Sequence, residues 1–185
     1  MHASSIDGLL RDLQNNFPQY ATSQVILIDA ALQRLMLIEQ GQEVSRWVIS
    51  TAAAGLGSQS GSYQTPPGVH RIKERYGDNA VPGAIFKARQ DTGCVAEILT
   101  EPGARSDTDN VTSRILWLDG LQPGINQGGD VDSFERYIYI HGTDEEGRLG
   151  QPASHGCIRM RNLDVIDLYE RVGIDTLVVI AATVE

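Results

Sequence analysis

The sequence predicts a mainly β domain, because it combines many short strand-like runs, few helical patterns and long irregular loops. Runs rich in β-branched and other apolar residues occupy residues 25–28, 35–38 and 44–49, and residues 40–42 are typical of a tight hairpin connection. Further strands are expected at residues 69–74, 94–99, 114–118, 135–140 and 176–181. Short strands in this arrangement indicate a sandwich or a partly closed barrel.

Long segments rich in Gly, Ser, Asp and Pro separate these runs. Residues 51–68 contain too many such residues for a regular element, and residues 101–113 and 119–134 predict two more loops. Loops of that length inside a compact domain usually have functional reasons, such as walls or lids of a site.

Two helices are expected. Residues 5–16 place apolar side chains at helical spacing between Ser5, which can cap the helix, and Pro18, which stops it. Residues 163–172 carry an apolar stripe between the capping residue Asn162 and Gly173. We expect the first helix to be a packing element or a lid.

The composition limits the class of partner. The chain has 185 residues, 24 acidic and 15 basic, with a net charge of -9 and no cluster of Lys or Arg. One domain with a real core is expected at this length. Nucleic acids and anionic membranes are not expected as partners, because both attract concentrated positive charge.

The N-terminal sequence lacks the basic start and the apolar run of a secretory signal. The most apolar stretch, residues 25–38, is interrupted by Asp29, Gln33 and Arg34 and does not predict a membrane span. A cytoplasmic location is therefore expected, or a periplasmic one if a leader has been removed.

The residues that can carry chemistry gather at 137–160. Cys157 has two imidazoles nearby in sequence, and a neighbouring imidazole is the usual means of ionising a thiol at neutral pH. His141 ends an apolar strand, from which it can be aimed as a base. Gly156 allows close approach of a substrate carbonyl, and the N–H groups of Gly156 and Cys157 could form an oxyanion hole. This set of groups suits acyl transfer through a thioester.

Other interpretations of the same residues stay open at this point. A free cysteine is commonly a small buried hydrophobe, and a histidine at a strand end is commonly a hydrogen-bonded structural residue. His141, His155 and Cys157 could also bind zinc, although the chain has no CxxC or HExxH spacing. Two cysteines, Cys94 and Cys157, are too few for a disulfide framework.

A longer pattern resembles a known family. The segment His141-Gly142-Thr143, followed by Ser154-His155-Gly156-Cys157-Ile158-Arg159 with twelve residues between His141 and Ser154, is similar to the signature of the L,D-transpeptidase catalytic domain. The family's opening hairpin resembles residues 25–50, and its Thr-Pro-x-Gly strand entry resembles residues 65–72. The helix after Arg161 and the strand at 177–180 also match, so the resemblance covers about residues 23–181.

The resemblance implies an L,D-transpeptidase-like β-sandwich with a short N-terminal helix and one helix after the cysteine motif. It divides the chain into an N-terminal helical segment, 1–22, and a catalytic domain, 23–185. The implied substrates are peptidoglycan stem peptides, cleaved between the L-centre of a third-position diamino acid and the following D-alanine. Cys157 would be the nucleophile and His141 the general base, oriented by backbone carbonyls near Gly142. No metal or organic cofactor is expected.

Substrate contacts are expected from residues around this pair. Ser154 and His155 would shape the pocket, and the backbone at Gly156 would hold the oxyanion. Arg159 could bind a substrate carboxylate or, alternatively, form an ion pair that holds the loop. Arg114 and Tyr137 are weaker candidates that lead strands toward the site.

Other chemically notable residues are expected to be structural. Arg136 should point away from the face of Tyr137. The residues expected to serve packing are His70, Cys94, Trp47 and Trp117.

The signature does not distinguish hydrolysis of the acyl-enzyme from its transfer to an amine. Because the expected location is cytoplasmic, we expect an L,D-carboxypeptidase that removes the terminal D-alanine of tetrapeptides in peptidoglycan recycling. One alternative is an L,D-transpeptidase that forms cross-links in the periplasm or cell wall. A second is a non-catalytic module that binds wall peptides.

Overall fold

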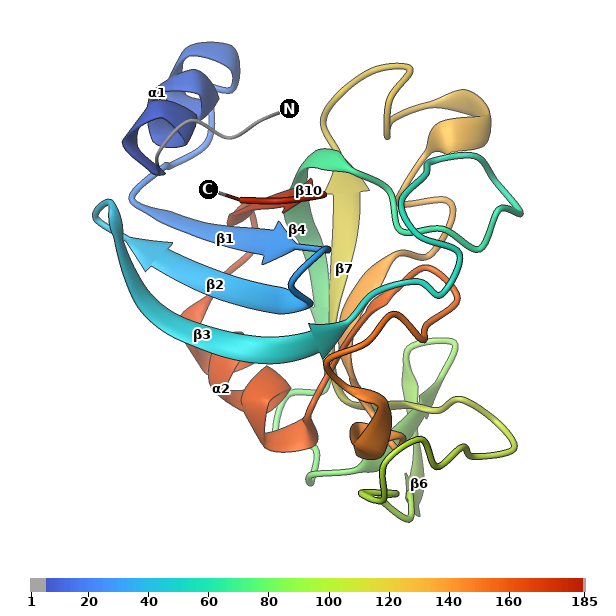
Figure 1. The fold of residues 1–185 in the computed structure, drawn as a ribbon. Coiled ribbons are helices and arrows are strands. Elements are labelled where there is room, and N and C mark those ends of the chain that lie inside the picture. The colour runs from blue at the N-terminus through green and yellow to red at the C-terminus, as the bar shows by residue number, and fades with distance from the viewer. Residues whose placement is uncertain (1–5, 185) are drawn as a thin grey trace.

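The computed structural model describes residues 6–184, and its strands form one strongly curved sheet (Figure 1). The elements in chain order are α1 (Ile6–Asn16), β1 (Gln24–Asp29), β2 (Arg34–Glu39), β3 (Gln42–Ser50), β4 (Gly68–Tyr76), β5 (Ala84–Lys87), β6 (Gln90–Val95), β7 (Val111–Gly120), η1 (Gly129–Val131), β8 (Tyr139–Thr143), η2 (Glu146–Arg148), β9 (Ile158–Met160), α2 (Asn162–Arg171) and β10 (Leu177–Ala181). The expectation of a mainly β fold with two α-helices is confirmed.

The sheet closes on itself. Its order is β4-β10-β1-β2-β3-β9-β8-β7-β5-β6, and an additional pairing joins β4 to β7. Eight strands therefore form a ring, and the β5–β6 hairpin extends from the outside of β7. Within the ring, β1 pairs with β10 and β8 pairs with β9 in parallel, and the other pairs are antiparallel.

Strict alternation along the strands separates the inside of the ring from its outside. Ile26 and Ile28 of β1 point into a continuous buried core, whereas Val25 and Leu27 belong to a second cluster on the outer face. The neighbouring strands β2 and β10 alternate in the same way.

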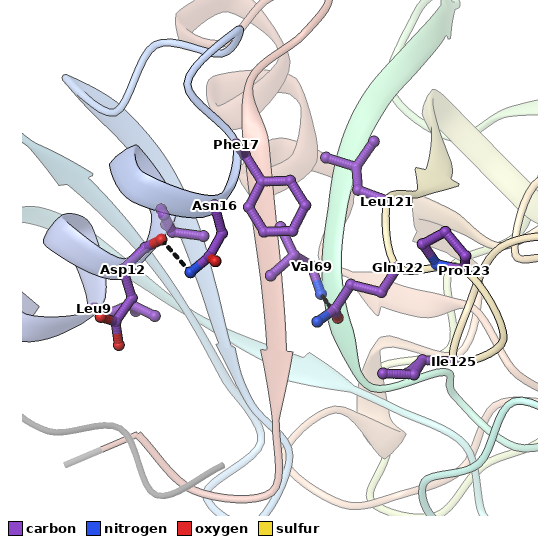
Figure 2. Close-up of a pocket in the computed structure, with 10 residues that line it drawn as sticks. Leu9, Asp12, Asn16, Phe17, Val69, Leu121, Gln122, Pro123 and Ile125 are labelled. Carbon is purple, nitrogen blue, oxygen red and sulfur yellow. Dashed lines mark hydrogen bonds between the residues drawn. The ribbon is translucent and has the colours of Figure 1, made fainter.

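Helix α1 covers this second cluster from outside. Leu13 is its buried residue, and Leu9, Leu10 and Phe17 pack partly buried around it. The first helix is thus a packing element on the β1–β2–β10 face. Beside it lies a mainly apolar hollow of about 560 Å³, bounded by α1 and the residues around Leu121 (Figure 2).

Helix α2 packs against β7 and β8 and buries its apolar stripe in the inner core. The expected role of Asn162 as a cap is wrong, because the N-cap is Arg161 and forms no side-chain cap bond. The Asn162 side chain instead donates to Thr143 O at 2.9 Å and accepts from the Thr112 hydroxyl at 2.6 Å. It therefore ties the helix start to β7 and β8. The capping role expected for Ser5 lies outside the described residues.

Several strand boundaries differ from those expected. The strand expected at 94–99 ends at Val95, and the one expected at 135–140 begins only at Tyr139 because residues 133–137 form a turn. The sequence pattern missed β5 and β9, which have four and three residues. The three loop predictions hold apart from η1, the two ends of β7, which reach into both later loops, and the first residue of β4.

Neither α1 nor α2, the α-helices of residues 6–184, combines the length and apolar composition required to cross a bilayer.

Candidate active site

The residues of the motif lie on the outside of the ring, at β7 and β8. In this antiparallel pair Ile115 lies opposite His141 and Trp117 lies opposite Tyr139. These side chains share the outer face, whereas Leu116 and the other intervening residues point into the core.

Cys157 reaches the same face through the pairing of β9. The parallel register sets Ile158 beside Ile140, so Cys157, one residue earlier, comes beside Tyr139. The contacts agree, because Cys157 Sγ accepts from Tyr139 N at 3.4 Å and donates to Tyr137 O at 3.3 Å. Tyr139 and His141 are two residues apart on one strand, so the thiol and the imidazole occupy one face of neighbouring strands.

Gly142 permits this close arrangement of strands. A Cβ added there would lie 2.7 Å from Thr112 O and 2.8 Å from Asn162 Oδ1, both too close for a side chain. The backbone of β8 can therefore approach β7 and α2 only with glycine at this position.

The hydrogen bond of His141 fixes which ring nitrogen can act as a base. The imidazole is buried, and Nδ1 lies 2.6 Å from Gly142 O. A carbonyl oxygen only accepts, so Nδ1 carries the hydrogen and Nε2 has the free electron pair in the neutral ring.

The charge states of this pair differ from the ionised thiol that the sequence led us to expect. Burial raises the pKa of Cys157 to about 11, and Asp109 adds to the increase, while the Tyr139 N–H opposes it. Burial also lowers the pKa of His141, although the Gly142 carbonyl and Asp109 act in the opposite direction. The resting site at neutral pH is therefore a neutral thiol with a neutral imidazole.

No hydrogen bond joins the two groups within residues 6–184, because the thiol donates to the Tyr137 carbonyl. Cys157 as a residue is only partly buried, at the edge of an aromatic cluster. The arrangement places a base and a nucleophile on the same face of neighbouring strands, with proton transfer still to occur.

The turn that presents Cys157 is held by its own polar groups. The Ser154 hydroxyl donates to Cys157 O at 2.5 Å and accepts from Gly156 N at 3.3 Å. The Thr65 hydroxyl donates to Gly156 O at 2.9 Å, and Gly156 has a φ of +136°, which side-chain-bearing residues rarely adopt. The Gly156 N–H expected in the oxyanion hole is thus engaged with Ser154 in this state.

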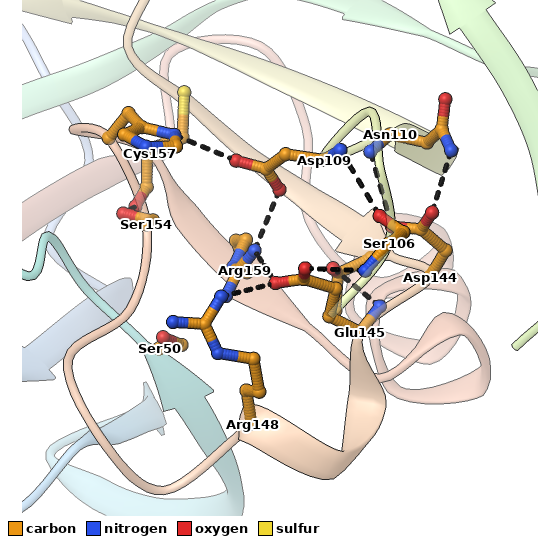
Figure 3. A network of polar contacts seen from close by, with 12 residues as sticks. Ser50, Ser106, Asp109, Asn110, Asp144, Glu145, Arg148, Ser154, Cys157 and Arg159 are labelled. Atoms are coloured by element: carbon orange, nitrogen blue, oxygen red, sulfur yellow. Dashed lines mark hydrogen bonds and ion pairs between the residues drawn. The ribbon is translucent and has the colours of Figure 1, made fainter. Parts of the chain in front are cut away.

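Arg159 forms the buried centre of a charge network behind the turn (Figure 3). Its Nη1 donates to Asp109 Oδ1 at 2.7 Å and to Glu145 Oε2 at 2.9 Å, and its side chain is 1% exposed. Arg148 also pairs with Glu145, at 2.7 Å. Of the two roles considered for Arg159, these contacts favour the ion pair that holds the loop.

Asp109 is the site residue that the sequence analysis missed. It bridges Arg159 and His155, whose Nδ1 lies 3.0 Å from Asp109 Oδ2, and so ties the 101–113 loop to the cysteine turn. Although burial alone would raise its pKa, the charge and hydrogen bond of Arg159 hold the pKa of Asp109 below the ordinary value. Asp109 has a φ of +40°, which is strained for a residue other than glycine. This backbone strain marks Asp109 as a notable residue, but the sequence does not show it.

A polar cleft of about 630 Å³ lies between this loop and the motif. Loop residues 105–109 form one side, and Ala153 and His155 form the other. The His155 side chain is 71% exposed and meets the exposed ring of Tyr63 edge-on at 6.1 Å. His155 therefore lines this cleft with most of its side chain exposed.

The remaining candidates fall in different surroundings. Tyr137 is 53% exposed, stacks on Trp117 at 5.5 Å and supplies the carbonyl that holds the thiol. Arg114 is buried, donates to the carbonyls of Ala80 and Ser113 and lies over the Tyr169 ring, so its contacts are internal ones beside α2.

The prediction that Arg136 points away from the face of Tyr137 assumed a strand at this position. Residue 136 lies in a turn, so strand alternation does not apply to it. Arg136 donates to Gln64 O at 2.7 Å, and its positive charge acts to lower the pKa of Cys157.

Of the residues expected to be structural, His70, Trp117 and Trp47 pack inside the protein, whereas Cys94 does not. His70 is buried between Gly68 O and the Ser133 hydroxyl, and Trp117 is buried in the aromatic cluster. Cys94 is exposed on β6 as a free thiol. Trp47 packs partly buried against the inner core.

Zinc binding would need ligands that converge on one point. His141 is directed to Gly142 O, His155 to Asp109 and Cys157 to Tyr137 O. Across residues 6–184, no three His, Cys, Asp or Glu residues are grouped so that they could hold a metal ion.

Comparison with known proteins identifies the family of this chain. The family model described as YkuD, L,D-transpeptidase catalytic domain, matches residues 23–180. The chain belongs to this family. Among curated proteins, "Putative L,D-transpeptidase YqjB" of Bacillus subtilis is 41% identical over 112 residues, which are 56% of this chain and 61% of that protein.

Solved structures of other proteins share the fold. The Bdellovibrio bacteriovorus protein Bd1075 has a TM-score of 0.55 at 16% identity, over 92% of this chain and 51% of its own. A cysteine-to-serine mutant of the Enterococcus faecium L,D-transpeptidase has a TM-score of 0.52 at 16% identity, over 86% and 50%. The chain thus spans about half the length of these structures, and the similarity establishes the fold.

The charge state of the thiol predicts how Cys157 reacts with iodoacetamide. In a Cys94→Ser variant without substrate, alkylation of Cys157 should be slow at pH 7 and should accelerate toward pH 11, because burial raises its pKa. The matched Cys157→Ser variant reports on exposed Cys94, which should be alkylated faster than Cys157 at pH 7. A Cys157 midpoint below about pH 7.5 would instead show a preformed thiolate.

The buried network predicts that Arg159→Met destabilises the protein by about 3 kcal/mol at pH 7, because Glu145 and Asp109 lose their shared cation. Arg159 helps hold the pKa values of both carboxyls below their ordinary values, against the raising effect of burial. Their contribution is therefore complete above about pH 4.5 and is lost as pH falls through the lowered pKa values.

Urea unfolding of wild type and Arg159→Met at several pH values measures this effect. The difference in unfolding free energy should shrink between about pH 5 and pH 3. The matched control is Arg161→Met. The exposed Arg161 side chain lies 3.7 Å from a Glu146 carboxylate oxygen, and its loss should lower the free energy of unfolding by less than about 1 kcal/mol. A pH-independent difference for Arg159→Met would contradict the electrostatic account.

Proposed function

We propose that this chain is an L,D-carboxypeptidase that removes the terminal D-alanine from peptidoglycan tetrapeptide stems. The observation that carries the proposal is the presentation of Cys157 and the basic Nε2 of His141 on one face of the paired strands β8 and β9. Membership of the L,D-transpeptidase family supports the choice of substrate.

Acylation begins from the neutral pair. Cys157 exchanges its Tyr137 carbonyl partner for His141, and Nε2 takes the thiol proton as sulfur attacks the scissile carbonyl carbon. The electron pair of the carbonyl moves to its oxygen. When that oxygen re-forms the double bond, the C–N bond breaks, and the proton on Nε2 passes to the leaving D-alanine nitrogen. The product is a thioester on Cys157 and free D-alanine.

Deacylation uses the same base. His141 Nε2 removes a proton from water as the water oxygen attacks the thioester carbon. Collapse breaks the C–S bond, and the proton on Nε2 returns to sulfur. The tripeptide leaves, and the neutral pair is restored.

The lowered pKa of His141 serves this cycle because the imidazole is unprotonated at neutral pH, so Nε2 is free to accept a proton. The raised pKa of the thiol keeps Cys157 uncharged until substrate is bound. Nucleophile formation is thereby coupled to attack.

The other expected residues divide into two groups in this proposal. Exposed His155 and Tyr137 contact the stem peptide at the mouth of the site. Buried Ser154 and Arg159 hold the turn, with Gly156 supplying its backbone conformation. The oxyanion would be bound by backbone N–H groups once Gly156 N leaves Ser154.

Transpeptidation is the second candidate, because the family and the Bacillus relative are named for it. The same thioester would then be attacked by an amine of a second stem peptide. The cytoplasmic location and the recycling role expected from the sequence remain predictions, which fractionation of the native cells would test.

The proposal predicts that purified protein converts a tetrapeptide into tripeptide plus D-alanine, with or without an added acceptor amine. Mass spectrometry of the products measures the partition. Cys157→Ala should abolish both products, whereas Cys94→Ala, at the exposed cysteine of β6, should retain full turnover. Dominant formation of the amine adduct would replace hydrolysis with transpeptidation as the function, and full activity of Cys157→Ala would overturn the mechanism.

A further inference from the structure

The β5–β6 hairpin places an arginine beside the cysteine face. Its turn residues Ala88 and Arg89 have φ values of +47° and +67°, and two successive positive φ angles are typical of a type I′ hairpin turn. β5 pairs with β7, so the hairpin extends from the edge of the strand that carries Trp117. Arg89 is thus delivered to the outer face of β7 and β8.

Aromatic rings hold the Arg89 side chain there. Its guanidinium carbon lies 4.6 Å from the centroid of the Trp117 ring and 5.6 Å from that of Tyr137. Its Nη1 donates to the Tyr139 hydroxyl at 3.2 Å. These contacts orient the guanidinium without neutralising it.

The opposite side of Trp117 also has a cationic neighbour. Phe134 stacks on Trp117 with ring centroids 4.0 Å apart, and Lys73 Nζ lies 3.7 Å from the Phe134 centroid. Lys73 has a carboxylate partner, Asp119, at 3.5 Å. Arg89 differs from it, because within residues 6–184 no carboxylate lies in ion-pair range of Arg89.

The guanidinium therefore has unused binding capacity. It carries five N–H donors, of which the Tyr139 hydroxyl occupies one and the Tyr76 hydroxyl engages a second, and its planar fork matches a carboxylate bidentately. This positive charge of Arg89 contrasts with the net charge of the chain, which is -9.

Tyr139 connects this cation to the nucleophile. Its backbone N–H donates to Cys157 Sγ, and its hydroxyl accepts from Arg89, so one tyrosine side chain separates the two groups. In a peptide cleaved at its last linkage, the free carboxylate lies within one residue length, about 3.5 Å, of the scissile carbonyl. That carboxylate therefore stays close to Cys157, on the face to which Tyr139 also holds Arg89.

We propose that Arg89 binds the free carboxylate of the residue that is released, and so selects peptides that end one residue beyond the scissile bond. The inference rests on the proposed function and adds the group that recognises the chain end. It concerns acylation, so it applies to either fate of the thioester.

Paired substrates test this role. Wild type, Arg89→Ala and Arg89→Lys are compared on a tetrapeptide with a terminal D-alanine carboxylate and on the same peptide with a terminal carboxamide. Loss of a charge-assisted bond predicts a fall of about 10-fold to 100-fold in kcat/KM for Arg89→Ala on the carboxylate, mainly through KM, with little change on the amide. Arg89→Lys should recover part of the preference.

The matched control is Lys87→Ala, which removes an exposed cation from the same hairpin outside the aromatic stack. It should leave kcat/KM unchanged on both peptides. An equal fall on both peptides for Arg89→Ala would show a merely structural role, and an unchanged preference would show that another group reads the carboxylate. Either result overturns the inference.

A binding measurement separates this inference from the proposed function. Calorimetry with Cys157→Ala protein measures affinity for both peptides without turnover, and adding Arg89→Ala should weaken binding of the carboxylate peptide alone. If wild type releases no D-alanine but this difference in affinity is found, the proposed function fails and the Arg89 site stands. If Cys157→Ala protein binds neither peptide, or binds both equally, the Arg89 site is wrong.

Discussion

The parallel pairing of β8 with β9 is the constraint on which the site depends. It sets Ile158 beside Ile140, and this register brings Cys157 beside Tyr139 on the face that also carries His141. A shift of one residue would turn the cysteine into the inner core. β9 has only three residues, so its position is maintained by its neighbours, by the pairing to β3 on its other side and by the buried charge network at Arg159.

That network also sets the electrostatics of the site. Arg159 holds Asp109 ionised, and the negative charge of Asp109 raises the pKa values of both Cys157 and His141, whereas Arg159 lowers both. The two opposing influences leave burial as the largest cause of each shift, and burial favours the neutral form of each group. Stability and reactivity are thus linked, because the same ion pairs anchor the 101–113 loop and limit the charge near the sulfur.

The sequence alone predicted what depends on local pattern. Runs of apolar and β-branched residues predicted the first strands, an apolar stripe predicted α2, and the motif from His141 to Arg159 pointed to the family. Short elements that depend on distant partners, such as β9, have no periodicity to detect. The role of Asp109 arises from contacts 46 and 50 residues away in sequence, and Arg89 lies in a turn without the usual Asn or Gly. Burial, which decides the charge of the thiol, is likewise a property of the assembled fold.

The central claim is that Cys157, with His141 as its base, forms a thioester with the stem peptide. Intact-protein mass spectrometry of acid-quenched mixtures tests this directly, with peptide mapping to locate the adduct. The account predicts a tripeptidyl mass increase on Cys157 that disappears in His141→Ala. Product formation with no adduct on Cys157, or an adduct of undiminished amount in His141→Ala, would contradict it.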